Sequence, residues 1–481
     1  MSTSLAIGIL AVYFLLLIIV AHFTSKGADT NTFFTANKQS PWWLVAFGMI
    51  GTSISGVTFI SVPGDVGNVS LSYYQIILGN LVGYFVIATV LLPLYYKLNL
   101  ISIYTYLEKR LGFWSYKTGS AFFLLARTLG SAARLFLAVQ VLQLAIFDKL
   151  NIPFAVSALV TIGLIWVYTY KGGVKTIIVT DTLQTFFLLT ALALTIVLIN
   201  HKLGFSFTGM VSAIQESKYS QMFFFDDFAY KHHFLKDFVS GIFISIVMTG
   251  LDQDLMQKNL TCKNINEAKK NMFWFCCTFA VVTLMFIALG ALLYIYANKI
   301  GFAIPAKTDE LYPVLALGGH FGIVAAVTFL LGITAATYAS SDSALTALTT
   351  AFCIDFMNIE KYQESERNKI KHYVHIGFSA LFFIVIMIFH AYSKQSIISA
   401  VFNIASYTYG PLLGLFAFGL FTKTPIKDKF VPIVCIIAPI LTFLIVSNSK
   451  AWLNGYEFGF EKLLLNGAIT FAGLYLLKKS E

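Results

Sequence analysis

The sequence contains little charge. Only 12% of its 481 residues are Asp, Glu, Lys or Arg, whereas 58% are hydrophobic, and the mean hydropathy is +0.77. Soluble globular proteins average about 25% charged residues. This shortage excludes an ordinary soluble protein and indicates a chain that lies mostly in lipid.

Cysteine is also scarce, and its spacing matches neither a metal site nor a disulfide framework. The five cysteines are Cys262, Cys276, Cys277, Cys353 and Cys435. Long polar segments are missing as well: the longest loop, about 201–233, has room only for a short amphipathic helix. We therefore expect no separate enzymatic or regulatory module, no transition metal and no organic cofactor.

Hydrophobic runs are what the chain has in abundance. Thirteen are long enough, at ~20 residues, to cross a bilayer as helices that satisfy their own backbone hydrogen bonds. These runs are 5–23, 42–62, 71–96, 118–147, 152–170, 176–200, 234–257, 270–298, 320–355, 369–391, 395–421, 430–447 and 460–477. The first run lacks a basic start and a small-residue cleavage site, so we expect a retained helix.

The net charge of +10 predicts topology rather than nucleic-acid binding, because the basic residues gather on one side of the membrane. That side carries 21 Lys and Arg, and the other carries 10. The richer loops are 24–41, 97–117, 171–175, 258–270, 356–371, 422–429 and the C-terminus. Short basic loops stay cytoplasmic. We expect a multi-pass protein of the plasma (inner) membrane with its N-terminus outside, its C-terminus cytoplasmic, and lipid but no nucleic acid as a partner.

Several ionisable side chains fall inside the predicted spans, where each costs roughly 2.5–3.5 kcal/mol to insert and needs a partner. They are Arg127, Arg134, Asp181, Asp252, Asp254 and Asp342. Arg134 and Asp342 fall near the middle of their spans. Asp252 and Asp254 fall near a cytoplasmic end, so we expect them to be solvated or to lie at a helix end.

Residues 333–355, ITAATYASSDSALTALTTAFCID, are unusually polar for a span. On a helix, Ala336, Ser340, Ser343 and Ala347 share one stripe, and Asp342 lies one step around from it. Hydroxyl and carboxylate oxygens close together suit a hard cation. The alternative is that the small residues only allow close helix packing.

Glycine interrupts two spans at matching places. The second span, WWLVAFGMIGTSISGVTFISVPG, would direct the carbonyls of Gly51 and Ile54 at a cation if it unwinds; otherwise it is a helix with a small-residue packing face. The seventh span, five spans later, contains Gly241 and Gly250. Such a pair of interrupted helices predicts a transporter built from inverted repeats, with its site near the bilayer midplane.

Five segments, in order, resemble the sodium/solute symporter family, which includes sodium-coupled sugar, proline and sialic-acid transporters. They are FFTANKQSPWW (33–43), IYTYLEKRLG (103–112), GGVKTIIVTDTLQ (172–184), AATYASSDSALT (335–346) and YTYGPLLGLFAFGLF (407–421). The resemblance implies an all-α integral membrane protein with about 13 transmembrane helices and a LeuT-type 5+5 inverted repeat. Residues 1–481 would then form a single transmembrane transporter domain. Its parts would be a leading helix (5–23), a first repeat (42–200), a second inverted repeat (234–421) and two trailing helices (430–477).

The resemblance also implies sodium-binding residues. Those of the main site would be Gly51, Ile54, Ala336, Ala339 and Ser340. Ala339 stands where the family usually has serine, so a water, Ser341 or Asp342 would have to replace one hydroxyl. Those of a possible second sodium site would be Asp181, Asp342 and Ser343.

The substrate pocket is expected to include Ser55, Thr58, Arg134, Ser245 and Asn403. Galactose-transporting members have glutamine at the position of Thr58 and asparagine at that of Ser245, so the family's sugar contacts are missing. Arg134 could hold a carboxylate through paired, charge-assisted hydrogen bonds. It could equally pair with acids or carbonyls of the protein itself.

These features together predict a sodium-coupled symporter, not an enzyme, that imports a small organic solute by alternating access, with a carboxylate-bearing solute favoured. A proton-coupled symporter of the same fold is the alternative, since Asp181 and Asp342 can titrate. A solute sensor that does not transport is less expected without a signalling domain. An intramembrane aspartyl protease is disfavoured because neither aspartate follows a glycine.

Overall fold

The computed structural model describes residues 2–26, 30–169, 173–392 and 397–479, and these residues form an all-helical bundle. Parts of several predicted features lie outside this described part. They are Gly172 in the third family-like segment, Tyr170 at the end of the fifth span, residues 395–396 at the start of the eleventh, and residues 27–29 and 171–172 in two of the basic loops.

Each predicted span coincides with a helix or with a bent pair of helices. Among the described residues, eight helices are long and apolar enough to cross a membrane, three bent pairs qualify as single broken spans, and α9 and α22 are shorter apolar helices. The matching elements are α1 (Thr3–Thr24), α3 (Trp42–Ser53) with α4 (Gly56–Val69), α5 (Tyr73–Val86), α8 (Phe113–Leu142), α9 (Phe154–Thr169), α10 (Gly173–Leu203), α12 (Phe234–Ser245) with α13 (Gln253–Asn259), α14 (Ile265–Lys299), α16 (Gly322–Asp355), α17 (Glu364–Tyr392), α18 (Ile397–Thr408) with α19 (Gly410–Phe421), α20 (Val431–Ser447) and α22 (Lys462–Leu476).

Short helices fill the connections between the spans. They are α2 (Thr30–Thr35), α7 (Thr105–Arg110), α11 (Phe207–Glu216), α15 (Leu311–Leu317) and α21 (Ser449–Trp452). Helix α6 (Leu92–Lys97) instead belongs to the third span, which runs as one helix from Tyr73 to Lys97. Helix α11 is the short helix expected in the longest loop. The π-helical turns η2 (Ile87–Leu91) and η3 (Gln143–Phe147) continue α5 and α8, and η5 (Ile246–Gly250) continues α12.

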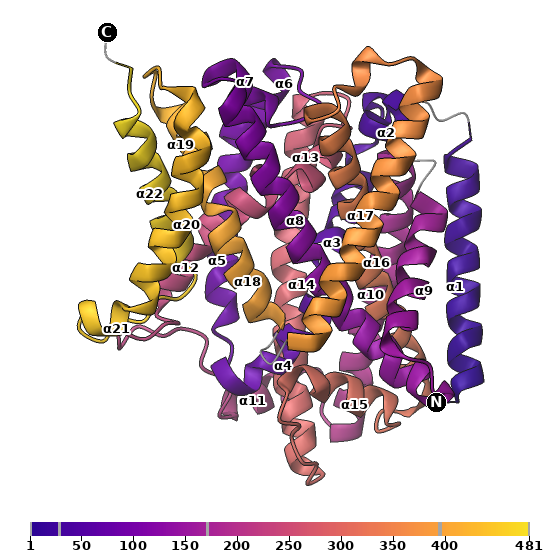
Figure 1. Ribbon diagram of the computed structural model, residues 1–481. Coiled ribbons are helices and arrows are strands. Elements are labelled where there is room, and N and C mark those ends of the chain that lie inside the picture. Colours follow the sequence, from indigo (N-terminus) through magenta and orange to yellow (C-terminus); the bar gives the residue numbers. More distant parts are fainter. Residues whose placement is uncertain (1, 27–29, 170–172, 393–396, 480–481) are drawn as a thin grey trace.

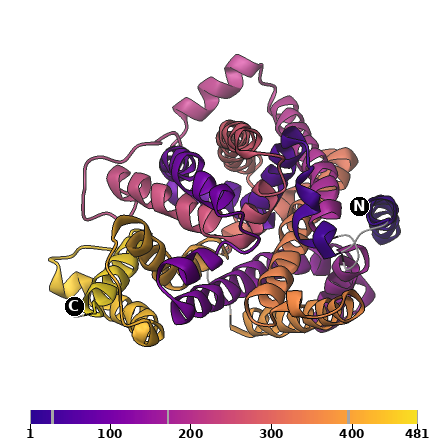
Figure 2. The ribbon, with the colours of Figure 1, turned by 90° about the horizontal axis from the view of Figure 1, so that it is seen from above.

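The spans stand side by side, and the two chain ends lie at opposite faces of the bundle (Figure 1). Seen from above, α1 and the yellow trailing helices lie at opposite edges (Figure 2). Helix α16 lies in the interior, where it packs against α3, α8 and α10, and nearly every residue from Phe329 to Ala351 is buried. The polar segment identified in the sequence is therefore shielded from lipid.

Three spans are broken. The axis bends by 55° between α3 and α4, by 69° between α12 and α13, and by 43° between α18 and α19. The first two breaks lie in the second and seventh spans, where glycine predicted them. The third break is unexpected, although Gly410-Pro411 explains it: proline lacks the N–H that would continue α18. The exact limits of the two repeats stay a prediction.

Helices α5 and α12 cross with their backbones in direct contact. A Cβ added at Gly241 would overlap the carbonyl of Ile76, and one added at Gly79 would overlap the carbonyl of Phe238. Small residues permit this kind of crossing in membranes, where close van der Waals packing drives helix association.

We expect Gly241→Ala to destabilise the protein by about 1–3 kcal/mol, because the methyl group must displace a neighbouring backbone. Gly377→Ala is the matched control, since a Cβ at this helical position has nothing within 4 Å. Both changes gain the same helix propensity. Thermal unfolding of the detergent-purified variants measures the difference, and equal melting temperatures would contradict the close crossing.

Candidate functional site

The break between α3 and α4 leaves two backbone carbonyls without donors. Ile54 leaves the helical conformation, with φ −86° and ψ 80°, although its own N–H still bonds the carbonyl of Ile50 at 2.8 Å. In a continuous helix, Ser55 and Thr58 would donate to Gly51 and Ile54. Neither bond forms, and no other described group donates to these two buried oxygens. Buried carbonyls of this kind call for a cation or a water.

Two glycines allow this break to sit tightly between α10 and α16. A Cβ at Gly51 would overlap the hydroxyl of Thr185 on α10, and a Cβ at Gly56 would overlap the hydroxyl of Thr337 on α16. The second contact places the 336–340 turn of α16 beside the break. The Thr337 hydroxyl has no hydrogen-bond partner among the described residues.

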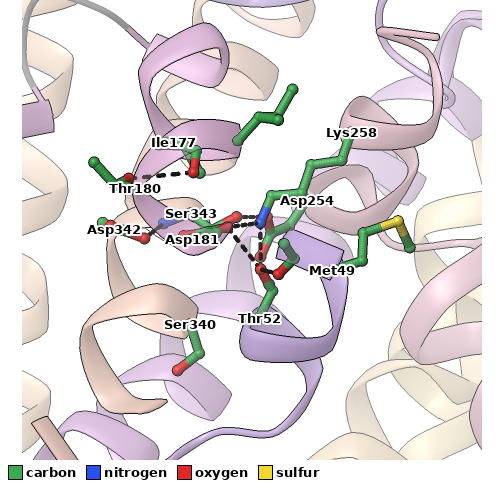
Figure 3. A network of polar contacts seen from close by, with 12 residues as sticks. Met49, Thr52, Ile177, Thr180, Asp181, Asp254, Lys258, Ser340, Asp342 and Ser343 are labelled. Atoms are coloured by element: carbon green, nitrogen blue, oxygen red, sulfur yellow. Dashed lines mark hydrogen bonds and ion pairs between the residues drawn. The ribbon is translucent and has the colours of Figure 1, made fainter. Parts of the chain in front are cut away.

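The residues predicted on α16 for the main sodium site are all buried. Ser340 donates to the carbonyl of Thr337 in its own helix at 3.1 Å, which leaves its lone pairs available. Figure 3 shows Ser340 apart from the polar network around Asp181. The structure thus brings the turn containing Ala336, Ala339 and Ser340 close to Gly56, the first residue of α4 after the break.

The second break is satisfied by the protein itself. Tyr95 donates to the carbonyl of Gly250 at 2.8 Å, and Tyr104 donates to the carbonyl of Leu251 at 2.9 Å. Both tyrosines are fully buried. The two breaks therefore differ: fixed phenol donors fill the second, whereas the first keeps acceptors free.

Asp181, which the resemblance assigns to a possible second sodium site, contacts two other side chains of the protein. Its Oδ2 accepts a hydrogen bond from Thr52 at 2.9 Å and forms an ion pair with the ammonium of Lys258 (Figure 3). The sequence predicts that Lys258 belongs to the cytoplasmic loop 258–270, and that prediction is wrong. Lys258 is 2% exposed and lies at the end of α13, which runs inside the bundle.

The other two predicted second-site residues also contact protein groups. Asp342 accepts from the phenol of Tyr168 at 2.8 Å and from the N–H of Ser343 at 2.5 Å. The Ser343 hydroxyl donates to Asp254. The polar groups of Asp181, Asp342 and Ser343 therefore point to three different partners.

Arg127 forms a buried ionic cluster with the two acids of the seventh span. Its guanidinium pairs with Asp254 and lies 3.7 Å from Asp252, to which Tyr409 also donates. The expectation that these aspartates are solvated is wrong, because α13 starts deep in the bundle. The helix-end part is confirmed for Asp252, whose carboxylate caps α13 by accepting from the N–H of Asp254 at 2.9 Å.

A cavity of about 90 Å³ lies between the first break and α12. Its size suits several waters or a small organic group. Four of the five predicted substrate residues line it, namely Ser55, Thr58, Arg134 and Ser245. Within the described part of the chain, Arg134 forms no hydrogen bond or ion pair, so the alternative in which it pairs with protein acids or carbonyls finds no support.

Asn403 lies elsewhere than the other four. It accepts a hydrogen bond from Lys462 and lines a neighbouring vestibule of about 520 Å³ that also reaches Asp65 and Lys231. The vestibule and the central cavity share three lining residues, Tyr73, Ile398 and Phe402. The ring centroids of Tyr73 and Phe402 lie 6.4 Å apart, so the two rings lie between the two spaces.

Sequence reasoning missed Lys258, Tyr168 and Tyr409 as site residues. For Lys258 a signal existed, since Asp252 is a good N-cap residue and predicts that a new helix starts there. That helix carries Lys258 inside the bundle rather than into a loop. The tyrosines gave no such signal, because aromatic side chains are common throughout the spans.

Comparison with known proteins places this geometry in context. Residues 33–425 match the model of the sodium:solute symporter family. The sodium/sialic acid symporter NanT of Aliivibrio fischeri is 25% identical over 454 residues, which cover 91% of this chain and 86% of NanT. The sodium-coupled monocarboxylate transporter 2 of Homo sapiens is 21% identical over 408 residues, which cover 82% of this chain and 64% of that protein.

A solved structure supports the fold directly. A substrate-bound, outward-open sodium-coupled sialic acid symporter superposes with a TM-score of 0.83 at 20% sequence identity, covering 98% of this chain and 97% of that one. The predicted all-helical membrane architecture of the LeuT type is confirmed.

Proposed function

This chain belongs to the sodium:solute symporter family, and we propose that it imports a small carboxylate-bearing solute together with sodium. Sodium-coupled solute symport, and not an enzymatic reaction, is its activity; sodium and the solute are both transported substrates. The observation that carries the carboxylate proposal is Arg134, a guanidinium that lines the central cavity and has no hydrogen-bond or ion-pair partner among the described residues.

We place the main sodium ion at the first break. Hard cations bind through several oxygens, and the carbonyls of Gly51 and Ile54 are free to supply two. The α16 turn offers the Ser340 hydroxyl and the backbone at Ala336 and Ala339 beside them. Because Ala339 lacks a hydroxyl, a water or the unpartnered hydroxyl of Ser341 completes the shell.

At the start of α4, the same break also suits an anion. The C-terminal end of α3 carries partial negative charge, whereas the N-terminal end of α4 carries partial positive charge. Ser55 and Thr58, at the start of α4, line the cavity that Arg134 faces. A carboxylate there would meet the helix end, two hydroxyls and a paired guanidinium contact.

Names of relatives agree with an acidic solute. The two related proteins reported above are named for sialic acid and for monocarboxylates. Both solutes are acids, and the position of Arg134 in the cavity supports an acidic solute for this chain as well. Because the cavity has a volume of only about 90 Å³, it favours a small acid over a large one.

Two barriers bracket the central cavity and would open in turn. The rings of Tyr73 and Phe402 line both the cavity and the vestibule. We expect the ion-paired cluster of Arg127 with Asp252 and Asp254 to form the barrier on the opposite side. Sodium entry supplies ~2.3 kcal/mol per 100 mV, and a tenfold gradient adds about 1.4 kcal/mol. One ion moving with one carboxylate carries no net charge, so the concentration gradient alone then drives uptake.

Proton coupling is the alternative that a specific feature favours. Asp342 contacts Tyr168 and the backbone of Ser343 but forms no ion pair within the described part of the chain. Such a buried acid could carry a proton. Uptake measured over a range of sodium concentrations at fixed pH separates the two mechanisms, because a proton-coupled symporter would show no sodium dependence.

We also propose that the face bearing the C-terminus is cytoplasmic. Two exposed lysines, one at each face, allow a labelling test. Each is replaced by cysteine in a variant from which the native cysteines have been removed. Lys429→Cys should react with a membrane-impermeant maleimide only in inverted vesicles, whereas Lys218→Cys should react in intact cells. The reverse labelling pattern would contradict the orientation.

Ser340→Ala should raise the sodium concentration for half-maximal uptake at least severalfold, because one oxygen ligand is lost. The matched control is Thr328→Ala, which removes a hydroxyl from an exposed turn of the same helix. Uptake into proteoliposomes over a sodium series measures the shift. An unchanged sodium dependence in Ser340→Ala would count against the assignment.

Arg134→Gln should weaken uptake of carboxylates by roughly 10–150-fold, since hydrogen bonds to charged groups contribute about 1.5–3 kcal/mol. Arg367→Gln, at an exposed arginine outside the cavity, is the control. Thermal-shift screens that compare small carboxylic acids with their amides identify the solute and test the proposal. A solute whose amide binds as tightly as the acid would overturn it.

A further inference from the structure

We propose that Lys258 stands in for a second transported cation, so that this symporter moves a single sodium ion per solute. The inference rests on the proposed sodium site and adds its stoichiometry. It starts from a contact that no sequence pattern indicated: a lysine ammonium on the aspartate predicted for a second sodium.

The ammonium of Lys258 lies where a small cation would lie. It forms an ion pair with Asp181 of α10 and a hydrogen bond with the hydroxyl of Thr52 of α3, while its own backbone belongs to α13 (Figure 3). Thr52 is the residue directly after Gly51, whose carbonyl faces the main sodium position. The fixed positive charge therefore lies next to the main site.

The remaining residues of the predicted second site are engaged as well. Ser343 donates to Asp254, and Asp342 accepts from Tyr168. The second carboxylate oxygen of Asp181, Oδ1, has no hydrogen-bond partner among the described residues. Lys258 thus supplies the positive charge that the site needs, and removing it would leave both oxygens of Asp181 for another cation.

A tethered cation and a transported one differ in how much charge crosses the membrane in each cycle. A buried carboxylate is stabilised by either, but the ammonium stays with the chain when the solute leaves. One sodium and one carboxylate then cross together without net charge. Without Lys258, Asp181 and the Thr52 hydroxyl become free, and a second sodium adds one positive charge to each cycle.

Equilibrium binding of radioactive sodium to the purified full-length chain tests the inference without knowledge of the solute. We expect the wild type to bind one sodium per chain with a Hill coefficient near 1. Lys258→Met should bind two, with steeper dependence on concentration. Lys269→Met, which removes an exposed lysine from α14, is the matched control and should behave as the wild type.

The paired variant Lys258→Met/Asp181→Asn removes both charges and should return to one sodium. Two sodium ions in the wild type, or one in a folded Lys258→Met, would overturn the inference. If Lys258→Met does not fold, the wild-type count still decides between one and two. Failure of the wild type to bind any sodium would contradict the proposed function instead.

Discussion

A helix that breaks inside a membrane must find partners for the backbone groups it frees, because lipid offers none. This chain meets the requirement differently at the breaks in its second and seventh spans. Tyr95 and Tyr104 donate to the carbonyls freed in the seventh span. At Gly51 and Ile54 no described donor is present, although both residues are buried. We propose that a transported cation binds these carbonyls, so that its arrival and departure couple ion binding to the state of the broken helix.

Buried charge follows a similar division. Arg127 is paired with Asp252 and Asp254, and Lys258 is paired with Asp181. Such pairs are costly to break, because removing one partner leaves an uncompensated buried charge and destabilises the protein by about 3–5 kcal/mol. Arg134 and Asp342 form no ion pair in the described part of the chain. We propose that charged groups without an ion-pair partner in the protein are the ones available to a transported ion or solute.

Hydrophobic length made the architecture readable from the sequence, because every predicted span needed ~20 apolar residues and each coincides with a helix or bent pair. The breaks near Gly51 and Gly250 were also predictable, because glycine weakens a helix locally wherever it stands in the sequence. The ion pairs were not predictable, since residues 77 positions apart, Asp181 and Lys258, meet only through tertiary packing. Asn403 lies on the expected helix but lines the vestibule instead of the central cavity. The direction in which a helical residue faces depends on how its helix packs against its neighbours, which the sequence alone did not give.

The most direct measurement is an experimental structure in sodium, compared with one in which choline replaces it. The account predicts density for an ion in contact with the carbonyls of Gly51 and Ile54 and with the Ser340 hydroxyl, present in sodium and absent in choline. Backbone N–H groups that close on those carbonyls in both conditions, with no ion between α3 and α16, would contradict it.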